Sequence, residues 1–196
     1  MSLLSDPPFA LGQTLGVDSA SDGGQWIGAV KHFPDVDPTT GRVRSNRLKT
    51  CVAVRNTSGA ALLPKRVVTF DTTTAGLAGF TATKGYSAST NEERVGVVDE
   101  YLPASGVAAN DVYWVTVEGP TEVAVALSGS DIAVGDRLAA ITAATSGATT
   151  AGRVTKSAVA AGTQLGNDNS LGVLGRACST GATTGAAVLA IVKTRY

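Results

Sequence analysis

The feature that most constrains the fold of this chain is an order of turns and apolar segments that occurs twice. Five landmarks of a first copy recur in the same order in a second copy, at an offset that varies only between 71 and 76 residues. A near-constant offset over five landmarks indicates a duplicated β-unit. The landmarks are turns and apolar strands rather than reactive groups, so the repeat describes a scaffold. The pairs are Leu63–Val67 with Val134–Leu138, Ala82–Lys84 with Val154–Lys156, Val95–Val98 with Leu171–Leu174, Ser105–Gly106 with Thr180–Gly181, and Tyr113–Val117 with Val188–Val192.

The composition favours short strands over long helices. Hydrophobic residues make up 43% of the chain, whereas charged residues make up only 16%, and there are 23 glycines. Threonine and valine favour pleated, half-buried surfaces, and glycine supplies turns. Sixteen basic residues balance sixteen acidic ones. A neutral chain lacks the field that attracts nucleic acid or anionic lipid, and weak repulsion between copies suits side-by-side packing. We therefore expect no nucleic-acid partner and, without a long apolar run, no membrane partner.

Short apolar segments bounded by turn residues predict an all-β protein with a barrel or a sandwich. The clearest strand is Val112–Val117, which we expect to end at Gly119 and Pro120. The last strand, Val188–Lys193, is apolar on both faces and is therefore predicted to be buried on both sides. Residues 139–152 are rich in small residues and are interpreted mainly as a loop. The other predicted strands are 51–54, 67–70, 95–98, 123–127, 137–141, 153–155 and 171–174.

Residues 1–48 differ from the rest of the chain, because neither a strand period nor a helix period is sustained there. We interpret them as an irregular, extended N-terminal arm, followed by a first β-unit (49–130) and a second (131–196), or by one continuous β-domain (49–196). The apolar side chains of the arm either contact a neighbouring molecule or pack on the chain's own domain. In the first case, removal of residues 1–33 should leave the β-fold intact. The candidate contact residues are Phe9, Leu11, Leu15, Trp26, Ile27, Phe33, Arg42 and Arg44.

The sequence contains no convincing constellation for catalysis or for a cofactor. His32 is the only histidine, and no phosphate-binding loop is present. Residues 35–41 resemble a calcium loop faintly, but they lack its distal glutamate, so a tight turn is favoured. Without an export signal, Cys51 and Cys178 are expected to be buried thiols. We therefore expect no enzyme activity, no cofactor and no metal.

The amino-acid sequences of the repeats are similar to those of the small β-domain head decoration (cement) proteins of tailed bacteriophages. The resemblance covers about residues 50–196. It rests on Val52–Gly59, Leu63–Lys65, Val67–Val68, Ile132–Leu138, Leu171–Leu174 and Gly185–Val192.

The resemblance implies a β-barrel or β-tulip-like fold that is often trimeric and sits on the outer capsid surface of the virion. The partner would be the major capsid protein, and the work would be to hold neighbouring capsid subunits together. Two alternatives remain at this point. One is another virion component of the tail, the fibre base or the head completion; the other is a carbohydrate-binding module that exposes Tyr113, Trp114 or Trp26.

Overall fold

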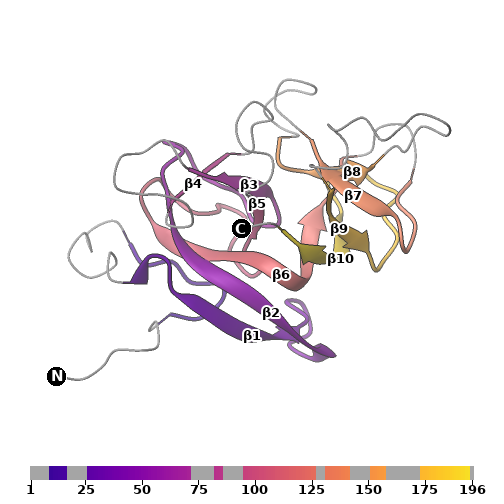
Figure 1. Cartoon of the computed structure of the whole chain (residues 1–196), viewed down its shortest axis with the longest axis horizontal. Coiled ribbons are helices and arrows are strands. Elements are labelled where there is room, and N and C mark those ends of the chain that lie inside the picture. The colour runs from indigo at the N-terminus through magenta and orange to yellow at the C-terminus, as the bar shows by residue number, and fades with distance from the viewer. Residues whose placement is uncertain are drawn as a thin grey trace.

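The computed structural model in Figure 1 is an all-β protein, as predicted. It describes residues 9–16, 26–71, 82–85, 95–126, 131–141, 151–157 and 173–194. These residues form ten β-strands in one sheet and no α-helix. Among them there is consequently no helix long and apolar enough to cross a membrane.

The first unit is a ring of five paired strands. Its members are β2 (Val43–Asn56), β3 (Val67–Phe70), β4 (Ala82–Gly85), β5 (Val95–Val98) and β6 (Val112–Ala124). The pairing runs β2–β4–β3–β5–β6, and β6 pairs β2 again. Every pair is antiparallel except β2–β4, which is parallel.

The second unit repeats this arrangement and begins with the second half of β6. It adds β7 (Arg137–Ala140), β8 (Val154–Lys156), β9 (Val173–Ala177) and β10 (Ala187–Lys193). The pairing runs β8–β7–β9–β10–β6, and a parallel bridge between Val125 and Val154 joins β8 to the end of β6. Figure 1 shows the two units side by side, with β6 running from one into the other.

Equivalent backbone hydrogen bonds confirm that the units are copies of one design. The antiparallel bridge between Leu62 and Val107 in the first unit matches that between Ile132 and Gly181 in the second. In the same way, Asn56 N–H donates to the carbonyl of Asp111 and Val125 N–H donates to that of Ala186, each at 2.9 Å. The duplication predicted from the sequence is therefore present in the strand pairing.

The predicted register was wrong at more than one landmark. Val67, which pairs with Val97, matches Arg137, which pairs with Arg176, and not Leu138. The largest error is at Gly96. Gly96 pairs with Val68 in the first unit, and Gly175 pairs with Leu138 in the second, so Gly175 is the equivalent of Gly96. The sequence comparison had matched Gly96 with Gly172, which lies outside the described residues. A glycine flanked by apolar residues occurs at both positions, so the local sequence alone could not show which glycine is the equivalent of Gly96.

Strand β6 does not end at Gly119 and Pro120, contrary to the prediction. Instead the chain passes through them and changes partner from β2 to β10, with Glu118 opposite Thr50 in one ladder and Lys193 in the other. Gly119 has φ +104°, and a Cβ there would lie 2.5 Å from the carbonyl oxygen of Leu48. Glycine is needed because the backbones approach closely where the strand turns from one unit into the next.

The predicted N-terminal arm contains regular structure. Strand β1 (Val30–Val36) pairs antiparallel with β2, and β2 already begins at Val43. The hairpin was not predicted because prolines interrupt this part of the sequence and argue against a strand. Pro34 is tolerated because β1 is an edge strand.

Three clusters of buried hydrophobic side chains form the core. The first unit is filled mainly by one cluster around Val54, Tyr113 and Val115. The second unit is filled by a cluster that also includes Val67 and Val97 of the first unit, so the two units share part of a core. The third cluster joins the N-terminal residues to the outer face of β6 around Trp114.

Candidate interaction site

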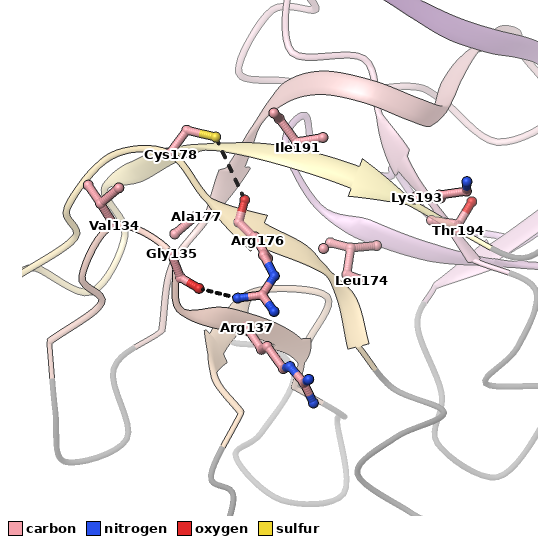
Figure 2. Close-up of a pocket in the computed structure, with 11 residues that line it drawn as sticks. Val134, Gly135, Arg137, Leu174, Arg176, Ala177, Cys178, Ile191, Lys193 and Thr194 are labelled. Carbon is pink, nitrogen blue, oxygen red and sulfur yellow. Dashed lines mark hydrogen bonds between the residues drawn. The ribbon is translucent and has the colours of Figure 1, made fainter.

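An open apolar groove of about 730 Å³ lies on the outer face of the second unit (Figure 2). Strands β7, β9 and β10 form it together with the turn before β7. Leu174 and Ala177 are buried at its base, Ile191 is half-buried, and Val134 at the rim is 65% exposed. The lining consists of Val134, Gly135, Arg137, Leu174, Gly175, Arg176, Ala177, Cys178, Ile191, Lys193 and Thr194.

Three exposed cations lie around this apolar base. Arg137 and Arg176 are direct register partners on β7 and β9, and Lys193 lies two residues beyond Ile191, the partner of Arg176 on β10. Arg176 Nη1 donates to the carbonyl oxygen of Gly135 at 2.9 Å, as Figure 2 shows. No carboxylate lines the groove, and none of the ion pairs found among the described residues involves these cations. Like charges directly opposite in a sheet repel each other, so this face favours an anionic group.

A smaller groove of about 370 Å³ continues the site toward the β1–β2 hairpin. It shares Ile191 and Lys193 with the first groove and adds Leu48, which is 59% exposed, and Glu118. Glu118 is the register partner of Lys193 and reduces the positive charge at this end. The uncompensated part of the site is therefore the pair Arg137 and Arg176.

Cys178 lies at this groove and is exposed, contrary to the expectation of a buried thiol. Its Sγ lies 4.0 Å from the carbonyl oxygen of Arg176. Cys51 is buried as expected, and burial raises the pKa of its thiol to about 12. Only Cys178 is placed to react with a reagent from solvent.

The apolar residues predicted as partner contacts come together on the chain's own β6. Phe9 stacks on Trp114 with ring centroids 4.6 Å apart, Phe33 meets the same ring edge-on at 5.2 Å, and Trp114 Nε1 donates to the carbonyl of Phe9 at 3.2 Å. Phe9, Trp26 and Phe33 are buried, which leaves them little surface for a partner. Leu11, Leu15 and Ile27 are partly buried against the same cluster. The structure thus replaces the partner contact with the other interpretation, in which this segment packs on its own domain.

The two predicted arginines have different environments. Arg42 is exposed, next to the hairpin turn. Arg44 is not part of a solvated face: it pairs with Asp35 and Glu100, each at 2.8 Å, and with Glu122 at 3.2 Å. Burial alone would lower the pKa of Arg44, but Glu100 and Asp35 reverse this effect and raise the pKa. Arg44 therefore ties the hairpin to the start of the second unit, through Glu122 on the far half of β6.

A buried lysine completes this network. Lys49 Nζ pairs with Glu100, and both side chains are almost fully buried. Burial alone would lower the pKa of Lys49, but Glu100 outweighs it and raises the pKa. Such pairs position elements, because removal of one partner leaves an uncompensated buried charge.

The acidic segment at residues 35–41 forms the predicted turn. Asp37 Oδ1 accepts hydrogen bonds from the backbone N–H groups of Thr39 and Thr40, both at 2.8 Å. These two bonds hold the pKa of Asp37 below its usual value. Asp35 points into the Arg44 network instead, so the two carboxylates do not form one site.

The sequence analysis did not find the groove residues Arg137, Arg176, Ile191 and Lys193. A signal was present, since the register partners Val67 and Val97 of the first unit correspond to Arg137 and Arg176 in the second. It becomes visible only when Gly96 is aligned with Gly175 rather than with Gly172, and Val67 with Arg137 rather than with Leu138.

No protein-family model and no curated protein matches this chain. Among solved structures, the N base of the head fiber protein gp8.5 of bacteriophage phi29 is similar, with a TM-score of 0.42 and 15% sequence identity. The match covers 74% of this chain and 98% of that one. A likeness of this extent leaves the function to be argued from the residues and the site themselves.

Proposed function

We propose that this protein is a structural component of a bacteriophage virion that binds the outer capsid surface and cements neighbouring major capsid subunits. The observation that carries the proposal is the exposed groove with an apolar base and same-sign cations on the second unit. Exposed apolar surface rimmed by polar groups is typical of protein–protein interaction sites. The resemblance of residues 50–196 to head decoration proteins supports the choice of partner.

The proposed mechanism is mechanical. A protein that binds the expanded capsid lattice and not its precursor stabilises the expanded form by mass action. Separation of two bridged capsid subunits then also requires the bridge to break, which opposes the outward pressure of packaged DNA. The resemblance implies that the chain forms trimers. Many such trimers on one capsid bind tightly although each individual contact is modest.

The buried carboxylates Glu100 and Asp99 are engaged in contacts within the chain. Glu100 accepts from Lys49, from Arg44 and from the backbone N–H of Glu122. Asp99 accepts from the backbone N–H groups of Gly12 and Tyr101. Both carboxylates thus hold structural elements in place, and we propose that the protein acts without chemical turnover.

The carbohydrate-binding alternative loses its support in the structure. Tyr113 and Trp114 are 0% exposed and Trp26 is 6% exposed, so none of them offers a platform to a sugar ring. Another virion component, of the tail, the fibre base or the head completion, is a second candidate, because the same scaffold and groove suit any stable virion contact.

The test is co-sedimentation of the purified protein with expanded and unexpanded shells of the major capsid protein from the phage that encodes it. We expect saturable binding to expanded shells, and many copies per virion by quantitative mass spectrometry. Few copies per virion would favour the second candidate, and absence of binding to both kinds of shell would overturn the cement proposal.

A further inference from the structure

The first unit has a face equivalent to the groove, and the second unit covers it. Val67 and Val97 are register partners there, and each is 1% exposed or less, within the core of the second unit. The backbone completes this contact, since Val67 N–H donates to the carbonyl of Gly152 at 2.7 Å and Ala124 N–H donates to that of Lys65 at 2.8 Å. In this design, the outer face of β3 and β5 is thus a site at which a following β-segment packs.

The same face of the second unit is open. Its register partners are Arg137 and Arg176, at the positions of Val67 and Val97. The carbonyl of Gly135 corresponds to that of Lys65, and it accepts the guanidinium of Arg176 where the first unit accepts the backbone of Ala124. The groove is therefore the second unit's version of an interface that is filled in the first unit.

A merely polar outer face would be enough to end a repeat and keep it in solution. This face differs from a simple cap in two respects. It keeps an apolar base of Leu174, Ala177 and Ile191, and it carries two arginines directly opposite each other on paired strands. An arginine fork binds carboxylates through paired hydrogen bonds. Both features match an extended segment that carries apolar side chains and carboxylates.

We propose that the groove of the second unit binds an extended acidic polypeptide segment of the partner, with its carboxylates on Arg137 and Arg176 and its apolar side chains on Ile191 and Val134. This inference rests on the proposed function for the identity of the partner, a capsid subunit. A polypeptide fits better than a nucleic acid, because the chain has net charge 0 and the base of the groove is apolar.

The test uses a short synthetic peptide in which glutamate and leucine occupy every second position in turn, with serine between them, so that both kinds of side chain lie on one face of the extended peptide. It is titrated into the isotope-labelled full chain and followed by amide NMR shifts. Two controls are the same peptide with lysine in place of glutamate, and a short DNA duplex. We expect the glutamate peptide alone to shift the amides of Arg176, Cys178, Ile191 and Lys193. Equal shifts with the lysine peptide or with DNA would overturn the proposal.

Arg137→Glu is the matching variant, and we expect it to weaken binding of the glutamate peptide by about tenfold or more. It places opposite charges at the Arg176 pair, so it should fold at least as well as the parent. Arg42→Glu is the control, since it also reverses one exposed cation but lies next to the β1–β2 hairpin turn, outside both grooves. Equal weakening by both variants would overturn the assignment of the site.

Co-sedimentation with expanded shells separates this inference from the proposed function. If the parent and Arg137→Glu bind shells equally, the docking inference fails while the cement proposal stands. If the parent does not bind shells but the glutamate peptide still occupies the groove and Arg137→Glu weakens it, the cement proposal fails and the groove assignment stands.

Discussion

At the scale of single residues, Gly96 and Gly175 show why the two units need glycine at the same place. A Cβ on Gly96 would lie 2.1 Å from Cγ1 of Val115, and a Cβ on Gly175 would lie 2.2 Å from the carbonyl oxygen of Ile191. These distances are too short for a Cβ, because the paired strand, β6 beside Gly96 and β10 beside Gly175, approaches the glycine closely. The glycine therefore belongs to the design of the unit rather than to a turn.

Asp99 is another residue with a particular environment. Its side chain is buried, and its two carboxylate oxygens accept from the backbone N–H groups of Gly12 and Tyr101. Burial raises the pKa of Asp99 from 3.8 to about 6, although these hydrogen bonds and Lys49 oppose the rise. The folded protein thus takes up a proton at a higher pH than the unfolded chain does.

This shift predicts a pH dependence of stability. A carboxyl whose pKa is raised by folding contributes stability below its unfolded pKa, and that contribution is lost as the pH rises through the folded value. The contribution of Asp99 to the free energy of unfolding should therefore fall by up to about 3 kcal/mol between about pH 4 and pH 6. Urea unfolding of the parent and of Asp99→Asn at both ends of this range measures it. The parent and Asp99→Asn have all other carboxyl groups in common. If the free energy of unfolding changed with pH in the same way in both proteins, the prediction would be contradicted.

At the scale of elements, residues 9–16 and the β1–β2 hairpin cover the outer face of β6. The reason is Trp114, whose large ring points away from the first unit's own core and would otherwise face solvent. Leu15 also pairs with Val112 through backbone hydrogen bonds in both directions, at 2.9 and 3.1 Å. This segment is part of the fold, so removal of residues 1–33 should destabilise the protein rather than leave it intact.

Phe9→Ala tests this packing with a single substitution. We expect a loss of about 3 kcal/mol in the free energy of unfolding, because the stacked ring is buried against Trp114. Tryptophan emission should also shift to longer wavelength as water reaches the ring. Leu11→Ala is the matched control, with a smaller expected effect because Leu11 is only partly buried. Unchanged stability and emission in Phe9→Ala would show that the segment does not pack in solution as described.

At the scale of the whole molecule, the two units are joined by more than the chain between them. They share β6 and one core cluster. Glu122 on the far half of β6 pairs with Arg44 at 3.2 Å and with Lys65 at 2.6 Å. We therefore expect one cooperative unfolding transition for both units.

Val97→Arg tests this coupling, because it places in the first unit the residue that the second unit carries at Arg176. The new charge would be buried without a partner, so we expect the free energy of unfolding to fall by several kcal/mol. We also expect both units to unfold together. Tryptophan fluorescence reports the first unit, and the amide signals of β10 report the second. Arg176→Val is the reciprocal control: it should stay folded and self-associate as its concentration rises. Native β10 signals beside an unfolded first unit would contradict the coupling.

Much of the scaffold could be read from residue order. The all-β class, the duplicated unit and most strand positions followed from alternating apolar residues and turn formers, which act over a few neighbouring residues. Strand β1 and the passage of β6 through Gly119 and Pro120 could not be read this way. Proline and glycine usually end strands, and only the neighbouring strands show where they are accommodated.

The candidate site depended on the tertiary structure. Sequence by itself determined that the chain carries a duplicated β-scaffold of neutral net charge, because local spacing and composition are independent of how the strands pair. Whether an apolar residue is core or surface was decided by that pairing: it buried Phe9, Trp26 and Phe33 on Trp114 and left Ile191 at an open groove. The reason is physical, since exposure depends on what packs against a face, and those neighbours lie far away along the chain.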